Sequence, residues 1–290
     1  MYETVLVPTD GSSTATTAAR GAIALAQRFD ASLHAISVLE NGDLPDDLDP
    51  ETLESLTDSA ERALTAVEDL TADAGVAATT SLVDPSGPVH EAIVDYALEH
   101  DVDVIVMGTH GRTGADRLVI GSVAERTLRV SPIPVLAVPE AAVLERDFGR
   151  ILVPTDGSEP ATAAADHAIA LATATDAMLQ VVHVVDTDAV PEESAGASVL
   201  EAFEAAGQHA VDDVVDRADE AGVRAVEASV LSGTPAQAIL DYAAQRDTAL
   251  VVVGTHGRAG LDRYLLGSVT ENVVRRAETP VLAVSPPDER

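Results

Sequence analysis

Internal repetition constrains this chain more than any other feature of its sequence. A shift of 146 residues places TVLVPTDGS (4–12) on RILVPTDGS (150–158). The same shift places MGTHGRTGADRLVIGSVAE (107–125) on VGTHGRAGLDRYLLGSVTE (253–271). This period is far too long for a solenoid repeat, whose units have about 20 to 50 residues. We therefore expect two copies of one domain, which also suits a length of 290 residues.

The seam between the copies lies in PEAAVLERDFG, residues 139–149, so we assign the domains to residues 1–146 and 147–290. Each copy alternates short runs rich in Val and Ile with longer amphipathic stretches, which predicts β-strands separated by α-helices. In the first copy the expected strands are 4–9, 32–40, 76–83, 102–108 and 134–138, and the expected helices are 12–29, 51–74, 86–100 and 121–130.

Some of the expected strands have no polar position. Residues 104–107 and 250–253 are apolar throughout, as in strands whose two faces are both covered. Such strands, alternating with helices, indicate a doubly wound α/β fold of the Rossmann-like class with a parallel sheet in each domain. The apolar face expected for the helix at 51–74 consists of Leu53, Leu56, Ala60, Leu64 and Val67.

Charge sets a limit on the partners. The chain has 49 acidic residues against 17 basic ones, all of them arginine, and a formal net charge of −32. The acidic residues are dispersed between apolar positions in both copies, as in halophilic proteins, where a Debye length of about 3 Å in molar salt screens self-repulsion. We expect no nucleic-acid partner, because a phosphate backbone requires a basic surface.

Several other classes are disfavoured by what the sequence lacks. There is no cysteine, which excludes disulfides and thiolate metal sites. No apolar run reaches the roughly 18 residues of a membrane span, and the N-terminus lacks the features of a signal peptide, so we expect a cytoplasmic protein without a membrane partner. No histidine pair at zinc-binding spacing has a third ligand, so no protein-held metal is expected.

The glycines after the fourth expected strand suggest an anion site. Ligands of open α/β sheets bind beyond the carboxyl ends of the strands, where Gly108 and Gly111 allow positive φ and a close approach of the backbone. Gly121 then opens a helix, whose free N–H groups and dipole suit a phosphate, and Ser122 can cap that helix or donate its hydroxyl. The candidate cations nearby are Arg112 and Arg117 in the first copy and Arg258 and Arg263 in the second.

The standard phosphate motifs are absent. A P-loop requires Gly-Lys-Ser/Thr, and the chain has no lysine. The dinucleotide fingerprint G-x-G-x-x-G is missing after the first strand, where the sequence reads PTDGS. Glycines at strand-to-helix turns are also common without any ligand, but here the pattern occurs twice with matched flanks.

Both copies resemble the universal stress protein family over essentially their full length. The resemblance rests on G-x-x-G-x9-G-S, which is similar to the signature of the family's ATP-binding members, on VPTDGS after the first strand and on PVLAV in the last. It implies a five-stranded parallel sheet in each domain. It also implies that the last strands of two domains pair, so that this tandem chain forms an intrachain pseudo-dimer; further self-association stays open.

By the same resemblance, ATP lies across the strand ends of each copy, with Mg²⁺ carried by the nucleotide. The residues after the first strand flank the nucleoside, a valine at the end of the second strand meets adenine through its backbone, and the glycine pattern surrounds the phosphates. In the first copy these residues are Pro8, Thr9, Asp10, Val38, Gly108, Gly111, Gly121, Ser122 and Val123. In the second copy they are Pro154, Thr155, Asp156, Val184, Gly254, Gly257, Gly267, Ser268 and Val269.

Some of these residues have a second interpretation. Asp10 and Asp156 can organise an Asx-turn as well as contact a ligand. No carboxylate–histidine–nucleophile order surrounds His110 or His256, so neither is assigned a catalytic role. The acidic stretch at 41–51 is either a solvated loop or a lid.

The favoured function is an ATP-binding, nucleotide-dependent regulator of the stress response, with two nucleotide sites per chain and an unidentified protein partner. Catalysis is not assigned, since no general base or stabilising lysine is evident, and ATP hydrolysis would at most be slow. One alternative is an enzyme of the adenine-nucleotide α-hydrolase-like class that cleaves ATP. The other is an interaction module without a ligand.

Overall fold

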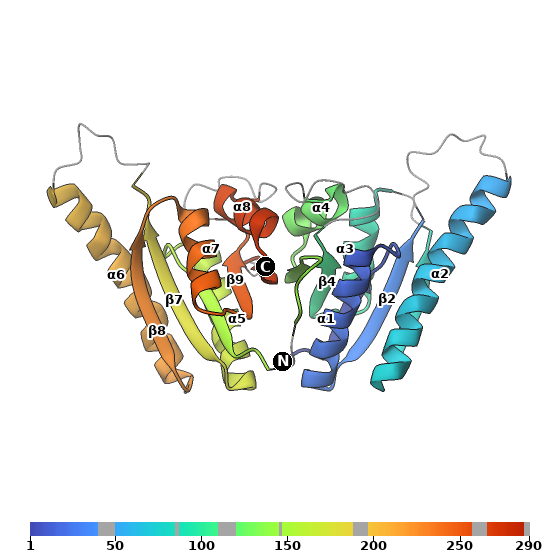
Figure 1. Ribbon diagram of the computed structural model, residues 1–290, viewed down its shortest axis with the longest axis horizontal. Helices are drawn as coiled ribbons and strands as arrows, with labels where there is room; N and C mark the ends of the chain where they lie inside the picture. The colour runs from blue at the N-terminus through green and yellow to red at the C-terminus, as the bar shows by residue number, and fades with distance from the viewer. Residues whose placement is uncertain are drawn as a thin grey trace. The chain divides into compact units, whose positions relative to one another are not determined.

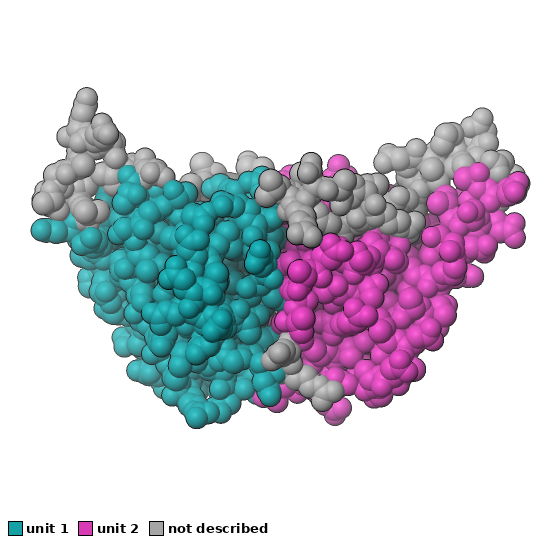
Figure 2. All heavy atoms as spheres, in the orientation of Figure 1, with its two compact units in different colours: residues 1, 147–290 teal, residues 2–146 magenta. Residues whose placement is uncertain are grey.

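The computed structural model describes residues 1–39, 50–84, 87–109, 120–144, 147–187, 197–256 and 266–286. The chain folds as two compact units, Tyr2–Arg146 and Asp147–Arg290, the second of which also takes in Met1. In Figure 2 the first of these, called the N-terminal half, is magenta and the second, called the C-terminal half, is teal.

The N-terminal half alternates strands and helices throughout (Figure 1). Its strands are β1 (Thr4–Pro8), β2 (Ser32–Val38), β3 (Ala78–Val83), β4 (Val104–Gly108) and β5 (Val135–Val138). Its helices are α1 (Ser13–Phe29), α2 (Pro50–Ala74), α3 (Val89–Glu99) and α4 (Ser122–Val130). The five strands are parallel, in the order β3-β2-β1-β4-β5, as expected for the fold class.

The C-terminal half repeats this architecture. Its strands are β6 (Arg150–Pro154), β7 (Met178–Val185), β8 (Val226–Ser232), β9 (Leu250–Gly254) and β10 (Val281–Val284). Its helices are α5 (Glu159–Thr175), α6 (Ala197–Glu220), α7 (Pro235–Gln245) and α8 (Ser268–Arg276). These strands are also parallel, in the order β8-β7-β6-β9-β10.

The strand order determines where a ligand can enter each half. Right-handed crossovers put α1 and α2 on one face of the N-terminal sheet and α3 and α4 on the other. The packing agrees, since α1 contacts α2 and α3 contacts α4. The chain reverses its direction across the sheet at β1, which lies between β2 and β4. Crevices at such a switch point, beyond the carboxyl ends of the strands, are the usual ligand sites of this fold.

Local sequence explains where the first helix of each half begins. Ser12 caps α1 by accepting a hydrogen bond from Ala15 N–H, and Ser158 caps α5 by accepting from Ala161 N–H.

Strands β4 and β9 are buried along their apolar positions, which confirms the prediction that both of their faces are covered. Among the described helices, none has both the length and the apolar character that a membrane span requires.

The halves depart from a uniform shift between the landmarks, and one expected core position was wrong. The shift between the halves is not 146 throughout: Gly75 and Gly222, both at positive φ after their helices, differ by 147, and β3 corresponds to β8 with a shift of 148. Differences in the connecting segments compensate, so the sequence landmarks on either side keep a shift of 146. Leu53, expected on the buried face of α2, is 42% exposed, because it lies in the first turns of a long helix that extends beyond the core.

Candidate functional site

A cavity of about 270 Å³ opens at the carboxyl ends of β1, β2 and β4 in the N-terminal half. It lies at the switch point of the sheet and is bounded by helices from both faces. Its lining residues are Pro8, Thr9, Asp10, Ala15, Ile36, Ser37, Val38, Leu39, Leu56, Ala60, Val89, Ile93, Met107, Gly108, Gly121, Ser122, Val123 and Ala124.

Most of the site residues named from the sequence of this half line that cavity. The structure brings together Pro8, Thr9, Asp10, Val38, Gly108, Gly121, Ser122 and Val123. Gly111 and Arg112 lie outside the described residues, as do His110 and Arg117. Sequence reasoning missed the apolar wall formed by α2 and α3. Its signal was present in Leu56 and Ala60, which are one helical turn apart on an apolar face.

The turn after β1 is held by its own side chains. Gly11 N–H donates to Thr9 Oγ1 at 3.3 Å, and Ser12 N–H donates to Asp10 Oδ1 at 2.9 Å. The second contact is an Asx-turn, so Asp10 does organise the loop. Asp10 also lines the cavity, which means that the two interpretations of this residue are compatible.

The backbone N–H and C=O of Val38 face the cavity beyond the last residue of β2 that pairs with β1. Thr9 N–H donates to Ile36 O at 2.8 Å, so residue 36 directs its backbone polar groups toward β1. Leu39 N–H donates to Val83 O, so residue 39 directs its groups toward β3. Because these directions alternate along a strand, Val38 N–H and C=O face the β1 side. The β1–β2 register ends at Ile36, which leaves that edge of Val38 beyond the last paired residue.

Gly108 was expected to adopt a positive φ, but its φ lies outside the positive range. Its role is instead to allow close packing of a helix. A Cβ at this position would lie 2.7 Å from Thr14 Cγ2 and 2.9 Å from the Thr14 carbonyl carbon. The lack of a side chain therefore lets α1 approach the end of β4 and form the floor of the cavity.

The first turn of α4 faces the cavity without a side-chain cap. The N-cap residue is Gly121, so Ser122 is the first helical residue and does not cap the helix, contrary to one of its two expected roles. The first hydrogen bond from α4 back to its cap runs from Glu125 N–H to Gly121 O. The N–H groups of Ser122, Val123 and Ala124 precede it and lack an intrahelical partner, as at any helix start. This end of α4 contrasts with α1, where a serine side chain fills that role.

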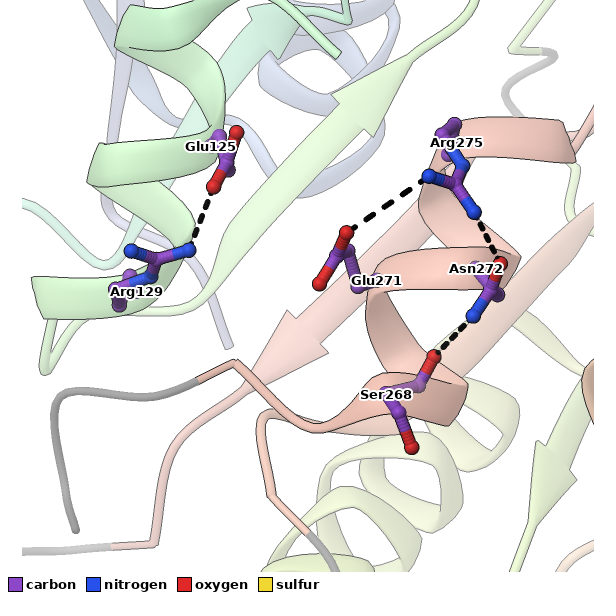
Figure 3. Close-up of polar contacts among 6 residues, drawn as sticks. All are labelled: Glu125, Arg129, Ser268, Glu271, Asn272 and Arg275. Carbon is purple, nitrogen blue, oxygen red and sulfur yellow. Dashed lines mark hydrogen bonds and ion pairs between the residues drawn. The ribbon is translucent and has the colours of Figure 1, made fainter. Parts of the chain in front are cut away.

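Arg129 near the end of α4 and Arg275 near the end of α8 contact neighbours within their own helices, as Figure 3 shows. Arg129 Nη2 lies 2.5 Å from Glu125 Oε1, and Arg275 contacts both Glu271, at 3.9 Å, and Asn272. Arg129 and Arg275 lie in the last turns, and their partners Glu125 and Glu271 lie in the first turns, where an anion would bind.

A second arginine of α4 lies closer to that first turn. Arg126 follows Ser122 by four residues, a spacing that puts two side chains on one face of a helix. Its counterpart in α8 is Asn272, whose Nδ2 donates to Ser268 O at 2.8 Å (Figure 3). The two helices thus differ by one positive charge at this position.

The C-terminal half repeats the backbone of the site. Gly157 N–H donates to Thr155 Oγ1 at 3.2 Å, and Ser158 N–H donates to Asp156 Oδ1 at 2.9 Å. Gly267 is the N-cap of α8, again without a side-chain cap. The expected residues in the described segments are Pro154, Thr155, Asp156, Val184, Gly254, Gly267, Ser268 and Val269. Gly257, Arg258 and Arg263 lie outside those segments.

Of the two histidines in the glycine-rich segments, His256 lies within the described residues. Its Nδ1 lies 3.0 Å from Thr255 Oγ1, and burial lowers the pKa of its ring from the usual value. A neutral imidazole next to a threonine hydroxyl does not make a catalytic arrangement by itself.

Comparison with known proteins gives a consistent result. A model of the universal stress protein family matches the chain twice, over residues 1–139 and 147–285. A universal stress protein of Methanocaldococcus jannaschii is 38% identical over 146 residues, which cover 49% of this chain and 85% of that protein. The crystal structure of a universal stress protein from Archaeoglobus fulgidus aligns with 99% of this chain and 97% of its own length, with a TM-score of 0.73 and 23% identity. A universal stress protein solved in complex with cAMP is 30% identical, covering 48% of this chain and 98% of its own, with a TM-score of 0.38.

Proposed function

The chain belongs to the universal stress protein family, and from that premise we propose that it is an ATP-binding regulator with a nucleotide site in each half. The observation that carries the proposal is the cavity at the switch point of the N-terminal sheet, which joins an apolar wall to an uncapped helix start. A nucleoside triphosphate has the same two parts, a flat base and a chain of anionic oxygens.

The base fits the end of the cavity that is farthest from α4. There Ile36, Leu39 and Leu56 offer apolar surface, and the free backbone edge of Val38 offers one donor and one acceptor. A purine edge carries complementary groups, so the base would be held by its shape and by backbone hydrogen bonds. This arrangement requires no charged side chain at that end.

The phosphates fit the other end. Three amide groups at the start of α4 and the positive end of its dipole suit an anion. Gly121 contributes by leaving that end open, and Arg126 adds a positive charge one turn later. Mg²⁺ carried by the nucleotide would offset part of the triphosphate charge. Such a metal would be bound mainly by the nucleotide and water.

The net charge of −32 opposes the binding of any nucleotide, which gives a test by salt. In about 2 M KCl the Debye length is only a few ångströms, so distant carboxylates are screened while contacts inside the cavity persist. We expect Mg-ATP affinity to be equal or higher in about 2 M KCl than in about 0.2 M KCl. A loss of affinity at high salt, in a protein that is still folded, would contradict this account.

Regulation rather than turnover is the favoured use of the site. Asp10 is engaged by Ser12 N–H in its turn, and the described cavity wall has no lysine or histidine to stabilise a transferred phosphoryl group. Binding would therefore bias a conformation or a contact with a protein partner. Release of pyrophosphate dependent on a second substrate would instead indicate the α-hydrolase-like enzyme.

The direct test is isothermal titration of the chain with Mg-ATP in about 2 M KCl. Gly121→Val should abolish binding to the N-terminal half, and Gly267→Val binding to the C-terminal half, because a valine side chain would project at the phosphate end. Gly149→Val is the matched control, since nothing lies within 4 Å of a Cβ at that position. If nucleotide-free wild-type protein binds no Mg-ATP, the ligand-free interaction module replaces this proposal.

A further inference from the structure

We propose that the two nucleotide sites are unequal and that His183 sets the difference by closing the base end of the C-terminal site. The C-terminal half would then bind a purine nucleotide at least about tenfold more weakly than the N-terminal half. This inference rests on the proposed function and specifies which half carries the high-affinity site.

Three residues that line the N-terminal cavity have informative counterparts. Ser37 corresponds to His183 by the shift of 146. Ala60 lies on α2, where the shift of 147 applies, and corresponds to Gly207 on α6. The buried positions of the two helices support this correspondence, because Leu64, Val67 and Thr71 match Val211, Val214 and Ala218.

The position of the His183 ring is defined by contacts on two sides. Its Nδ1 lies 2.8 Å from Thr155 O, and since a carbonyl oxygen can only accept, Nδ1 carries the hydrogen and donates it. On the other side, a Cβ at Gly207 would lie only 2.2 Å from His183 Cδ2. The imidazole therefore spans from the end of β6 to the surface of α6.

These contacts place the ring where the N-terminal half is open. Thr155 corresponds to Thr9, so the neighbours of the ring correspond to Thr9 and Ala60, and the ring itself replaces the side chain of Ser37. All three of those N-terminal residues line the cavity. His183 is only 8% exposed, so its ring fills interior space and does not lie on the surface. The space lost is at the end assigned to the base.

Gly207 gives independent support for a built arrangement. Glycine in the interior of a helix is less favourable than alanine by about 1 kcal/mol, so its presence in the middle of α6 calls for a structural reason. The close approach of His183 supplies that reason. His183 and Gly207 form a matched pair in place of Ser37 and Ala60.

The phosphate end is largely retained in the C-terminal half. Gly267 caps α8 with nearly the same backbone angles as Gly121 at the start of α4, φ −61° and ψ 141° against φ −59° and ψ 140°. Two side chains change there: Asn272 replaces Arg126, and Thr270, whose hydroxyl donates to Gly254 O at 2.6 Å, replaces Ala124. The effect of His183 is therefore on recognition of the base and not of the triphosphate.

The experiment isolates each site before changing its base end. In Gly121→Val protein, where the C-terminal site remains, His183→Ser should raise Mg-ATP affinity at least about tenfold by titration calorimetry. His209→Ser, which removes an exposed histidine from the same helix as Gly207, is the matched control. Inorganic triphosphate should bind the His183→Ser protein no more tightly than its parent.

The reciprocal change covers the case in which His183→Ser does not fold. In Gly267→Val protein, the pair Ser37→His and Ala60→Gly should lower Mg-ATP affinity at least about tenfold. Equal affinities of the two wild-type sites would overturn the inference and leave the proposed function standing, as would unchanged affinities in both folded sets of variants. Failure of the wild-type chain to bind Mg-ATP in either half would overturn both.

Discussion

The two halves agree in the hydrogen bonds of the turns after their first strands and differ in the side chains packed beside their second strands. The turns after β1 and β6 have the same two hydrogen bonds with nearly the same lengths. The side chains near the start of the second strand differ, however. Beside β2, an aromatic cluster is formed by His34, Tyr96 and His100. Beside β7, a polar network is formed by Gln180, Glu227 and Arg246.

This comparison shows which features a duplicated fold can alter. Turns, glycine contacts and helix starts define where the strand ends lie, and they depend on backbone geometry that few residues satisfy. Side chains between sheet and helix can be exchanged in sets, provided that their volumes and hydrogen bonds match. The two halves therefore share a frame and can differ in ligand affinity, pH response and stability.

The largest effect should come from adding a Cβ where helix and strand meet. A Cβ at Gly254 would lie 2.6 Å from the backbone carbon and oxygen of Pro160, while one at Gly108 would lie 2.7 Å from the Thr14 side chain and 2.9 Å from the Thr14 backbone. Because backbone cannot rotate aside, Gly254→Ala should lower the free energy of unfolding by about 3 kcal/mol and Gly108→Ala by about 2 kcal/mol. Chemical denaturation measures both, and equal or small losses would show that the halves are not packed as described.

A second difference concerns pH, because His167 in α5 replaces Gly21 of α1. Burial lowers the pKa of His167 from 6.5 to about 4, so below pH 6.5 the unfolded chain binds a proton that the folded chain does not. Stability should therefore fall as the pH drops from 6.5 toward 4. Between pH 7 and about pH 5 the wild type should lose about 2 kcal/mol more than His167→Gln, whose side chain does not titrate in this range.

Denaturation curves at the two pH values give this difference directly, and the acidic groups that both proteins share cancel in it. Equal losses for wild type and His167→Gln would mean that the histidine is solvated in the folded state.

The smallest effect on stability should come from removing the hydroxyl group of Tyr96 or of Tyr242, which occupy matching positions. Tyr96 Oη lies 3.1 Å from His34 Nδ1, whereas Tyr242 Oη is buried with no hydrogen-bond partner among the described residues. Tyr96→Phe should cost about 1 kcal/mol, and Tyr242→Phe should be neutral or slightly stabilising, since it removes an unsatisfied hydroxyl. Thermal unfolding of the two variants compares them, and a larger loss for Tyr242→Phe would reverse the assignment.

Sequence patterns predicted the elements well because the repeat supplied each signal twice. The all-apolar runs at 104–107 and 250–253 indicated doubly covered strands, and the G-x-x-G-x9-G-S pattern pointed to the edge of the sheet where the cavity lies. These features are local, since each depends on a few consecutive residues and on the periodicity of burial.

What the sequence could not predict depends on contacts between distant residues. The role of Gly108 follows from Thr14, and that of Gly207 from His183, 24 residues earlier. The shifts of 147 in α6 and 148 in β8 are offset in the connecting segments, so they are invisible in an alignment of landmarks. An isolated glycine in the middle of a predicted helix was the one available sign of such a contact.

The contact between His183 and Gly207 also restricts how one half could have been converted into the other by single substitutions. Starting from serine and alanine at these positions, introducing histidine first would force its ring against a Cβ only 2.2 Å away. Introducing glycine first would cost only about 1 kcal/mol of helix stability. The accessible order is therefore glycine and then histidine, so a slightly destabilising loosening of α6 would have preceded the arrival of the histidine.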